Sequence, residues 1–423
     1  MDSLIKTLTD RHLFDAATSP ELDAYLTAEP RTIYAGFDPT SKSLQIGNFV
    51  TIMALRHYQL RGHRPLAIVG GATGMIGDPS GKTSERQLLT REAVAENLVG
   101  IKENLSRFLD FEDKKAPALL LNNADWFDGL SYTDFLRDVG KYFRMGAMLG
   151  KDSVKSRLES EGGMSYTEFS YQLLQAYDFL VLNDRHNCTV QLGGSDQWGN
   201  MTAGIDLVRK LRSKETFAMT FPLVCDSSGK KFGKSEGNAV YLDSSLTSYY
   251  DFYQYFLRVE DADVVRMLKI FTFLPMQDIV DLEQTLKTEP EKRTPQRRLA
   301  EEVTKLVHGA AGLSVAEKAT QVLFGGSIDG MRATDLIKVL GDVKSAKLAI
   351  GDVVGQRVID LVFNAGFTKS KGEARRLMES GGLYMNNVKL PSETTKVSTS
   401  DIIDGAVLML RSGKRNYFLI HVQ

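Results

Sequence analysis

The sequence predicts an α/β protein with a doubly wound parallel sheet, followed by a helical domain and a small α+β domain. In the first half, short β-rich runs alternate with helical stretches. The β signal then disappears between about 246 and 307, and strand patterns return near the end of the chain. At ~150 residues per domain, 423 residues correspond to about three domains, which we place at 1–225, 226–350 and 351–423.

The strands of the first half are separated by helices, which predicts βαβ units and a parallel sheet. We expect these strands at 32–37, 66–69, 118–121, 189–192 and 217–224. Clusters rich in Gly or Asp follow some of them, at 36–40, 70–74 and 193–196. Because open α/β sheets bind ligands at the carboxyl ends of their strands, we expect the functional groups in these clusters.

The second half changes from helices to a mixed pattern. Periodic apolar residues predict helices at 249–257, 263–271, 276–286 and 295–307. After 351, two further helices are expected at 356–365 and 370–380, and strands at 383–385, 406–410 and 417–420. This part has the composition of a small α+β module.

Composition excludes several classes of protein. Lys plus Arg total 52 against 53 Asp plus Glu, so no chain-wide basic field points to nucleic acid. Cys188 and Cys225 are the only cysteines, which excludes a disulfide framework and fits a reducing compartment. The six histidines lack a close ligand set, and no apolar run approaches ~18 residues. We therefore expect a cytoplasmic protein without a membrane span or a protein-bound metal.

The Gly-rich cluster at 70–74 and the residues after it almost match two nucleotide motifs. Only three residues separate Gly77 from Gly81, so the Walker spacing is not met, and the run 70–74 is not G-x-G-x-x-G. What remains is a Gly-rich strand end followed by Asp78, Lys82 and Arg86. A flexible turn with a solvated helix explains this segment as well as a phosphate site does.

The segment 38–48, which follows the first strand, carries a more specific motif and precedes a helix expected at 49–60. Gly47 near a helix N-terminus allows a flat ring to approach the backbone, and the exposed N–H groups favour phosphate. The segment resembles the His-x-Gly-His signature of class I aminoacyl-tRNA synthetases, with Gln45 and Asn48 in place of both histidines.

The loop at 230–235 reads Lys-Lys-Phe-Gly-Lys-Ser between Gly229 and Gly237. Lysines on a Gly-flanked loop can close over a polyphosphate and stabilise its developing charge, although a basic surface loop would have the same composition. After a doubly wound sheet, the loop resembles the second class I signature, Lys-Met-Ser-Lys-Ser, in the form typical of bacterial tyrosyl-tRNA synthetases.

Tyr171, Gln175 and Asp178 are spaced i, i+4 and i+7, so they share one stripe of a helix. An amphipathic surface helix is the simpler interpretation. The family resemblance instead implies a tyrosine-binding helix, with Tyr34 and Asp178 at the phenol hydroxyl, and Asp78, Tyr171 and Gln175 around the α-ammonium. It also assigns Gln197 to the tyrosine.

The same resemblance assigns residues to ATP and to the reaction. It places the ATP contacts at Gly36, Asp38, Gly47, Asn48, Gly194, Asp196 and Lys234, of which Gly194 and Asp196 meet the ribose. It places the catalytic groups at Thr40, Gln45, Lys82, Arg86, Lys231 and Lys234. Mg²⁺ is expected to arrive with ATP.

The final module carries the segments 365–377 and 381–386, which resemble an S4-type RNA-binding domain. From Gly351 onward there are ten Lys or Arg and seven Asp or Glu, a local excess of positive charge. A solvated helix would account for the charges alone. The resemblance implies tRNA contacts at Lys369, Lys371, Arg375 and Arg376.

The family resemblance implies a tyrosine–tRNA ligase that activates L-tyrosine with ATP and transfers it to tRNA(Tyr). Two alternatives remain open: an inactive RNA-binding relative, which the loss of both histidines favours, and a tryptophan-activating enzyme. The family resemblance implies a homodimer. The segment 126–148, rich in Phe, Tyr and Met, is either its interface or ordinary core.

Overall fold

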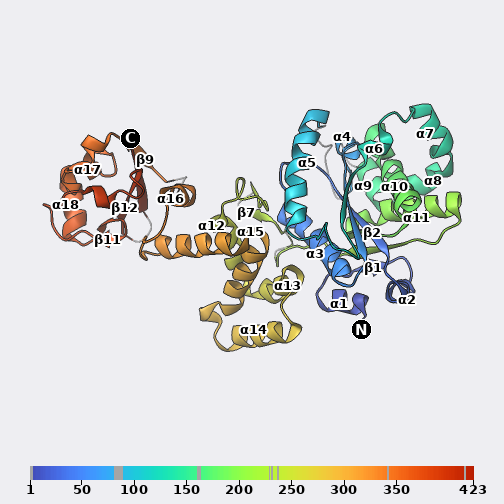
Figure 1. Ribbon diagram of the computed structural model, residues 1–423, viewed down its shortest axis with the longest axis horizontal. Helices are drawn as coiled ribbons and strands as arrows, with labels where there is room; N and C mark the ends of the chain where they lie inside the picture. Colours follow the sequence, from blue (N-terminus) through green and yellow to red (C-terminus); the bar gives the residue numbers. More distant parts are fainter. Residues whose placement is uncertain are drawn as a thin grey trace. The chain divides into compact units, whose positions relative to one another are not determined.

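The computed structural model describes residues 3–80, 89–159, 163–227, 229, 232–235, 238–340, 343–413 and 416–423. The chain forms two compact units (Figure 1). The first comprises Met1–Leu246 and Arg258–Val307, and the second Thr247–Leu257 and His308–Gln423. Over the described residues, no helix is both long and apolar enough to cross a membrane.

A sheet of six strands, counted over the described residues, forms the centre of the first unit in the order β1-β6-β5-β2-β3-β4. Its strands are β1 (Ala16–Ala17), β2 (Thr32–Phe37), β3 (Arg64–Val69), β4 (Leu119–Asn122), β5 (Cys188–Gly194) and β6 (Phe217–Phe221). β2 to β6 are parallel, so the expected doubly wound sheet is confirmed. The strand order reverses between β2 and β5, which marks the position where such sheets bind ligands.

Two details of this sheet differ from the sequence prediction. The last strand ends at Phe221 rather than at 224, because Pro222 has no N–H to continue the ladder. The short β1 pairs antiparallel with β6 through Ala16 and Ala17. Two alanines carry no periodic pattern, so sequence alone does not reveal this edge strand.

Helices cover both faces of the sheet, with α3 and α5 on one side and α10 and α11 on the other (Figure 1). These four helices are α3 (Ile46–Leu60), α5 (Arg91–Ser106), α10 (Tyr166–His186) and α11 (Trp198–Arg212). Strands covered on both faces should be apolar throughout, and β6 is buried along its whole length. α10 begins with a capping box, in which the Ser165 hydroxyl accepts from the Glu168 N–H at 3.2 Å.

Shorter helices complete the first half of the chain. They are α1 (Leu4–Asp10), α2 (Leu22–Ala28), α4 (Thr73–Ile76), α6 (Ala124–Phe127), α7 (Tyr132–Asp138), α8 (Met145–Leu149) and α9 (Asp152–Leu158). β7 (Lys234–Ser235) and β8 (Asn238–Ala239) form a small antiparallel ladder.

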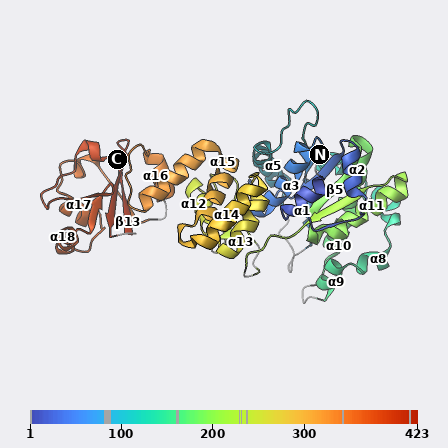
Figure 2. The same cartoon turned by 90° about the horizontal axis from the view of Figure 1, so that it is seen from below.

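The expected helical region is present, and α13 and α14 lie side by side in it (Figure 2). Its helices are α12 (Tyr249–Leu257), α13 (Asp261–Phe271), α14 (Met276–Thr288) and α15 (Thr294–Leu323). α15 is longer than expected and has a kink at Gly309, whose φ is 72°. Glycine reaches this backbone conformation without steric cost.

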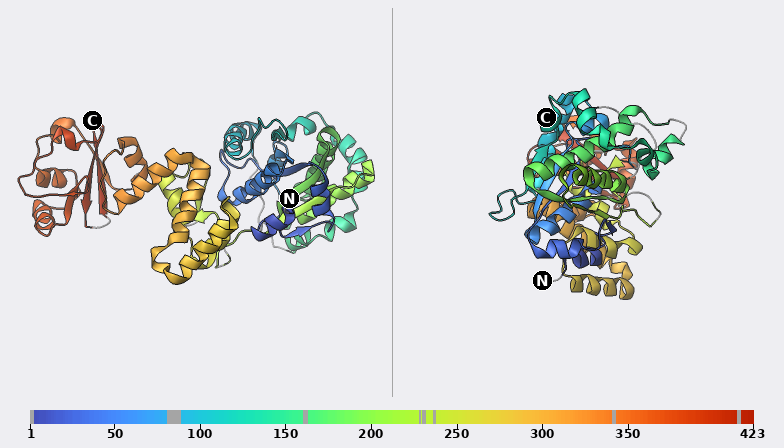
Figure 3. Two further views of the ribbon diagram at one scale, coloured as in Figure 1. Left: turned by 60° about the horizontal axis from the view of Figure 1, so that its bottom comes forward. Right: turned by 90° about the vertical axis from the view of Figure 1, so that its right-hand side faces the viewer.

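The C-terminal part contains a second sheet, β11-β10-β12-β13-β9, with helices on both faces (Figure 3). Its elements are α16 (Ala333–Val339), β9 (Ser345–Leu348), α17 (Val358–Asn364), α18 (Lys371–Glu379), β10 (Leu383–Met385), β11 (Val388–Lys389), β12 (Val407–Ser412) and β13 (Asn416–Val422). Alternate strand residues enter different cores: Leu408 and Leu410 pack with α17 and α18, and Val407 and Met409 with α16.

Candidate active site

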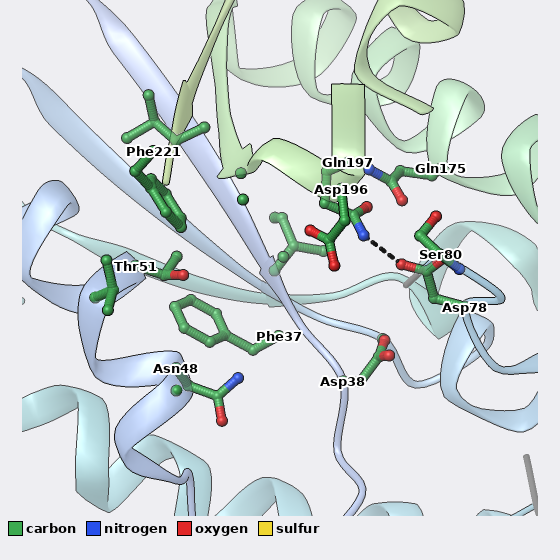
Figure 4. Close-up of a pocket in the computed structure, with 18 of the residues that line it drawn as sticks. Phe37, Asp38, Asn48, Thr51, Asp78, Ser80, Gln175, Asp196, Gln197 and Phe221 are labelled. Atoms are coloured by element: carbon green, nitrogen blue, oxygen red, sulfur yellow. Dashed lines mark hydrogen bonds between the residues drawn. The ribbon is translucent and has the colours of Figure 1, made fainter. Parts of the chain in front are cut away.

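A cavity of about 700 Å³ lies in the first unit at the carboxyl ends of the parallel strands. Figure 4 shows Asp78, Gln175, Asp196 and Gln197 gathered on one side of it, and Asn48 on α3 on another. Every described side chain or glycine that we assigned from sequence to tyrosine or ATP lines the cavity. These are Tyr34, Gly36, Asp38, Gly47, Asn48, Asp78, Tyr171, Gln175, Asp178, Gly194, Asp196 and Gln197, and Thr40 and Gln45 line it as well.

α10 contributes its polar stripe to this cavity. Tyr171 and Asp178 are only 5% exposed, and Gln175 lies between them on the same lining. On the opposite side, Ala176 and Leu180 are buried in the core. The helix is therefore covered on both sides, which contradicts the simpler interpretation as an amphipathic surface helix.

Asp178 lies at the closed end of the cavity with two donors. The Trp126 indole N–H donates to Oδ1 at 2.8 Å, and the Asn123 amide donates to Oδ2 at 3.1 Å. Burial raises the pKa of Asp178 to about 7, although both donors favour the charged form. The nearby Tyr34 hydroxyl is buried without a hydrogen-bond partner among the described residues, and burial together with Asp178 raises its pKa.

Sequence reasoning missed Asn123 and assigned Trp126 only to a segment that was either interface or core. Trp126 is 8% exposed and contacts Asp178 directly. Asn123 also donates to the Thr73 hydroxyl at 2.9 Å and accepts from the Ala72 N–H at 2.8 Å, so it links the Gly-rich turn after β3 to the acid. Neither residue belongs to a local motif, so the contact appears only in three dimensions.

A second carboxylate, Asp78, is part of a polar network on the wall of the cavity. The Gln197 amide donates to Asp78 Oδ2 at 2.6 Å (Figure 4), and the Ser80 N–H donates to Oδ1 at 2.9 Å. The Asn200 amide nitrogen lies 3.3 Å from Gln175 Oε1 and 3.3 Å from Gln197 Oε1. The network therefore fixes the orientation of both glutamine side chains.

Asn200 is another residue that sequence reasoning missed. It lies on α11, three residues after Gln197, so the two face the same way at the helix start. This i, i+3 spacing could have predicted from the sequence that Asn200 lies beside Gln197. Asn200 is only 7% exposed, and its nitrogen also approaches Ser80 Oγ at 3.3 Å.

The N-terminus of α3 carries the altered signature. The helix begins at Ile46 rather than at 49, so Gln45 is its N-cap residue. Asn48 Oδ1 accepts from the Gln45 N–H at 3.1 Å, which directs the Asn48 oxygen to the backbone and leaves its amide nitrogen as the donor group. Gly47 is exposed, and no atom lies within 4 Å of a Cβ built on it.

The lysine loop meets this helix terminus. Gly233 has a φ of 102°, and a Cβ placed on it would lie 3.2 Å from the Gly47 nitrogen. Lys234 begins β7, but its side chain lies outside the described part of the structure, as do Lys82, Arg86 and Lys231 entirely. The two signature segments are thus in contact through their glycines.

The residues assigned to tRNA lie in the second unit, separately from the cavity. Lys369, Lys371, Arg375 and Arg376 are all exposed, the last three of them on α18. Lys371 pairs with Asp360 at 2.6 Å and Arg375 with Glu393 at 3.4 Å. α18 therefore presents its basic side chains to solvent.

Comparison with known proteins agrees with this geometry. Residues 26–325 match the family model described as tRNA synthetases class I (W and Y), and residues 327–420 match the tyrosine–tRNA ligase SYY-like C-terminal domain. The tyrosine–tRNA ligase of Protochlamydia amoebophila is 49% identical over 100% of this chain and 99% of its own length. The chain belongs to the class I tyrosyl-tRNA synthetases. It is accordingly an aminoacyl-tRNA synthetase, a tyrosine–tRNA ligase.

Other tyrosyl-tRNA synthetases are similar to the chain over comparable lengths. The tyrosine–tRNA ligase of Rhodopirellula baltica is 47% identical over 100% of this chain and 97% of its own length. A C-terminally truncated mitochondrial tyrosyl-tRNA synthetase from Aspergillus nidulans has a TM-score of 0.69 and 31% identity, covering 77% of this chain and 95% of that structure. These relatives do not favour the alternative of an inactive RNA-binding protein.

Proposed function

We propose that the cavity binds L-tyrosine at its closed end and ATP at its open end. Its shape and lining support this assignment, since a buried carboxylate and the unpaired Tyr34 hydroxyl adjoin one void. A phenol hydroxyl placed between them donates to Asp178 and accepts from Tyr34. The α-ammonium then meets Asp78, Tyr171 and Gln175.

The same groups exclude phenylalanine. A substrate without the hydroxyl leaves the Tyr34 hydroxyl buried and unpaired and gives Asp178 no third donor, and that cost exceeds the value of one ordinary hydrogen bond. Tryptophan would place an indole against the same acid. The buried pair Tyr34 and Asp178 is the single observation on which the choice of tyrosine depends.

The first reaction joins the tyrosine carboxylate to the α-phosphate of ATP. The carboxylate is already ionised at neutral pH, so no general base is required, and the protein contributes positioning and charge stabilisation. The new bond forms between a carboxylate oxygen and the α-phosphorus while the bond to pyrophosphate breaks. Thr40, Gln45, Lys82, Arg86, Lys231 and Lys234 are the groups that we assign to the departing pyrophosphate, with Mg²⁺ carried by ATP.

Gln45 and Asn48 replace the signature histidines as neutral donors. Gln45 presents an amide N–H toward the phosphates, and Asn48 keeps its nitrogen available because its oxygen caps α3. Removing a donor used only in the transition state costs ~10² to 10³ in rate, whereas exchanging one donor for another costs less. The substitutions are therefore compatible with an active enzyme.

In the second reaction a terminal ribose hydroxyl of tRNA attacks the tyrosyl carbonyl and AMP leaves. We assign tRNA binding to the C-terminal module, through Lys369, Lys371, Arg375 and Arg376. The proposed domains remain the catalytic domain at 1–225, the lysine loop with the helical anticodon-binding region at 226–350, and the S4-like domain at 351–423. Basic side chains on one exposed helix suit a phosphate backbone.

We also propose a cytoplasmic homodimer. Tyr132 and Met145 of the 126–148 segment are 60% and 58% exposed, whereas Trp126 and Met148 are buried, so this segment has both core and surface apolar groups. Tyr and Met are both enriched at protein interfaces, so exposed side chains of these types on one segment suit an interface. Light scattering of the purified protein measures the oligomeric state.

Tyrosine-dependent exchange of pyrophosphate into ATP tests the proposed site. We expect exchange with tyrosine, much less with phenylalanine or tryptophan, and a large loss in Lys234→Ala. Exchange no greater than in a folded Lys234→Ala control would reject the proposal. Preference for tryptophan would reject the assignment of Tyr34 and Asp178.

A further inference from the structure

The segment 38–45 connects β2 to α3 and carries Asp38, Thr40 and Gln45 at the edge of the cavity. It has little regular structure of its own, and Thr40 is exposed. Groups that stabilise a departing phosphate must nevertheless be held in place, since a 1 Å displacement can cost ~10² in rate. The position of this segment therefore needs support from elsewhere in the fold.

α5 supplies that support along one face. Asn97 donates its amide to the Pro39 carbonyl at 2.8 Å. One turn farther, Gly100 lies so close to the segment that a Cβ on it would be 1.9 Å from the Lys42 carbonyl oxygen. Asn104 Oδ1 then accepts from the Ser43 hydroxyl at 2.8 Å and the Leu44 N–H at 2.9 Å.

These α5 residues are spaced i, i+3 and i+7, so they lie along one stripe of the helix. Asn97 is 8% exposed and Asn104 is fully buried. None of the three lines the cavity. They contact the backbone of the segment rather than any group assigned to a substrate.

The chain after the lysine loop holds the segment from another direction. The Ile46 N–H donates to the Val240 carbonyl at 3.0 Å, and the Leu242 N–H donates to the Leu44 carbonyl at 2.9 Å. The Asp243 N–H donates to the Ser43 hydroxyl at 3.0 Å. Ser43 thus connects α5, the segment and the stretch of chain after β8.

We propose that Asn97, Gly100 and Asn104 are positioning residues for adenylate formation, which set Thr40 and Gln45 against the phosphates of ATP. This inference rests on the proposed roles of Thr40 and Gln45. If α5 only packed against the segment, it would not need a glycine where the two come closest, nor an asparagine on each side of that glycine to hydrogen-bond the segment. Gly100 permits the approach, and the two asparagines fix the register of the segment.

Gly100→Ala tests the inference, with Val99→Ala as the matched control. Val99 is 63% exposed on the same helix, and both changes raise helix propensity. The added methyl of Gly100→Ala displaces the segment. We expect the maximal pyrophosphate-exchange rate to fall ~10²-fold. The tyrosine Kd, measured by equilibrium dialysis without ATP, should stay within twofold, and Val99→Ala should match the wild type.

Asn97→Ala provides a second variant if Gly100→Ala does not fold. It removes the bond to Pro39 and should lower the maximal exchange rate roughly fivefold, again with unchanged tyrosine Kd. Wild-type rates in folded Gly100→Ala or Asn97→Ala would overturn the inference, as would equal losses in rate and tyrosine affinity. Inactivity of the wild type and Val99→Ala would instead reject the proposed function.

Discussion

The two ends of the cavity are built in different ways. At the closed end, Asp178 and Tyr34 are buried side chains on α10 and β2, and Asp178 is held by fixed donors from Asn123 and Trp126. At the open end, Thr40 and Gly47 are exposed, and the supporting contacts are mostly to backbone. The contrast teaches that the proposed tyrosine end is built from desolvated polar side chains, whereas the proposed ATP end depends on how loops are placed.

Asp178→Ala should produce the largest effect and tests the closed end directly. It removes a charged acceptor and leaves the Trp126 indole and the Asn123 amide without their partner. The lost hydrogen bond from the substrate to a charged group contributes about 1.5–3 kcal/mol, and leaving the substrate hydroxyl buried without its acceptor costs about 1–3 kcal/mol more, so kcat/KM for tyrosine should fall by ~10² to 10⁴. Pyrophosphate exchange at varied tyrosine measures the change. An effect below tenfold, with circular dichroism unchanged, would contradict the proposed phenol site.

Gln45→Ala tests the open end and should have the next largest effect. We expect the maximal exchange rate to fall ~10²-fold, because a donor that acts only in the transition state is lost. The tyrosine Kd should not change, since Gln45 precedes α3 as its N-cap residue and is not among the hydrogen-bond partners of Asp178. Gln45→His restores a donor and should remain within about tenfold of the wild type. Equal rates in all three proteins would mean that position 45 does not contact the phosphates.

The pH profile of tyrosine binding sharpens the comparison further. The pKa of Asp178 is raised to about 7 by burial, so the carboxylate, which we propose accepts from the phenol hydroxyl, forms as pH rises through 7. Between pH 6 and 8, KM for tyrosine should therefore decrease up to about tenfold. Asp178→Asn cannot ionise and should show a flat profile. A wild-type profile equally flat would indicate that the acid is already charged at pH 6.

Folding stability should change in the opposite direction over the same interval. Because the folded pKa of Asp178 lies above its usual value of 3.8, the folded state holds this proton more tightly than the unfolded state. Its contribution to the free energy of unfolding is complete below pH 4 and is lost as pH rises through about 7. Thermal unfolding of the wild type and Asp178→Asn measures this difference in slope.

Arg376→Ala compares an exposed basic side chain of the C-terminal module with the two ends of the cavity. Of the proposed substitutions, it should have the smallest effect on kinetics. A single exposed phosphate contact contributes about 1 kcal/mol, so KM for tRNA should rise roughly three- to tenfold. Pyrophosphate exchange should be unchanged, because the reaction does not require tRNA. Lys338→Ala, which also removes one positive charge from an exposed helix position of the second unit, serves as the charge-matched control. An unchanged KM for tRNA would exclude Arg376 from the RNA contact.

Sequence patterns revealed most of the fold and much of the cavity lining. The strands buried on both faces gave strong signals, and helices such as α13 and α14 had clear periodicity. β1 and β9 were missed, because two alanines and the run Ser345–Leu348 carry no distinctive alternation. Both are edge strands, for which pairing rather than composition determines the structure.

The parts of the site that sequence could not reveal depend on contacts between distant segments. Asn123 and Trp126 lie more than 50 positions before Asp178 and share no motif with it. The raised pKa of Asp178 could not be predicted either, because it results from burial of the carboxyl group in the folded protein. Gly100 reads as an ordinary helix glycine until the Lys42 carbonyl is placed beside it.

Asn123 joins the buried acid to the turn after β3, since one amide contacts Asp178, Thr73 and Ala72. A variant that accepts an amino acid without a phenol hydroxyl would require a change at Asp178. Here, replacing Asp178 alone would leave Asn123 with a broken contact and loosen the turn that leads to Asp78. A redesigned enzyme would therefore need changes at 123 and 178 together, so that Asp78 keeps its position for the α-ammonium of the new substrate.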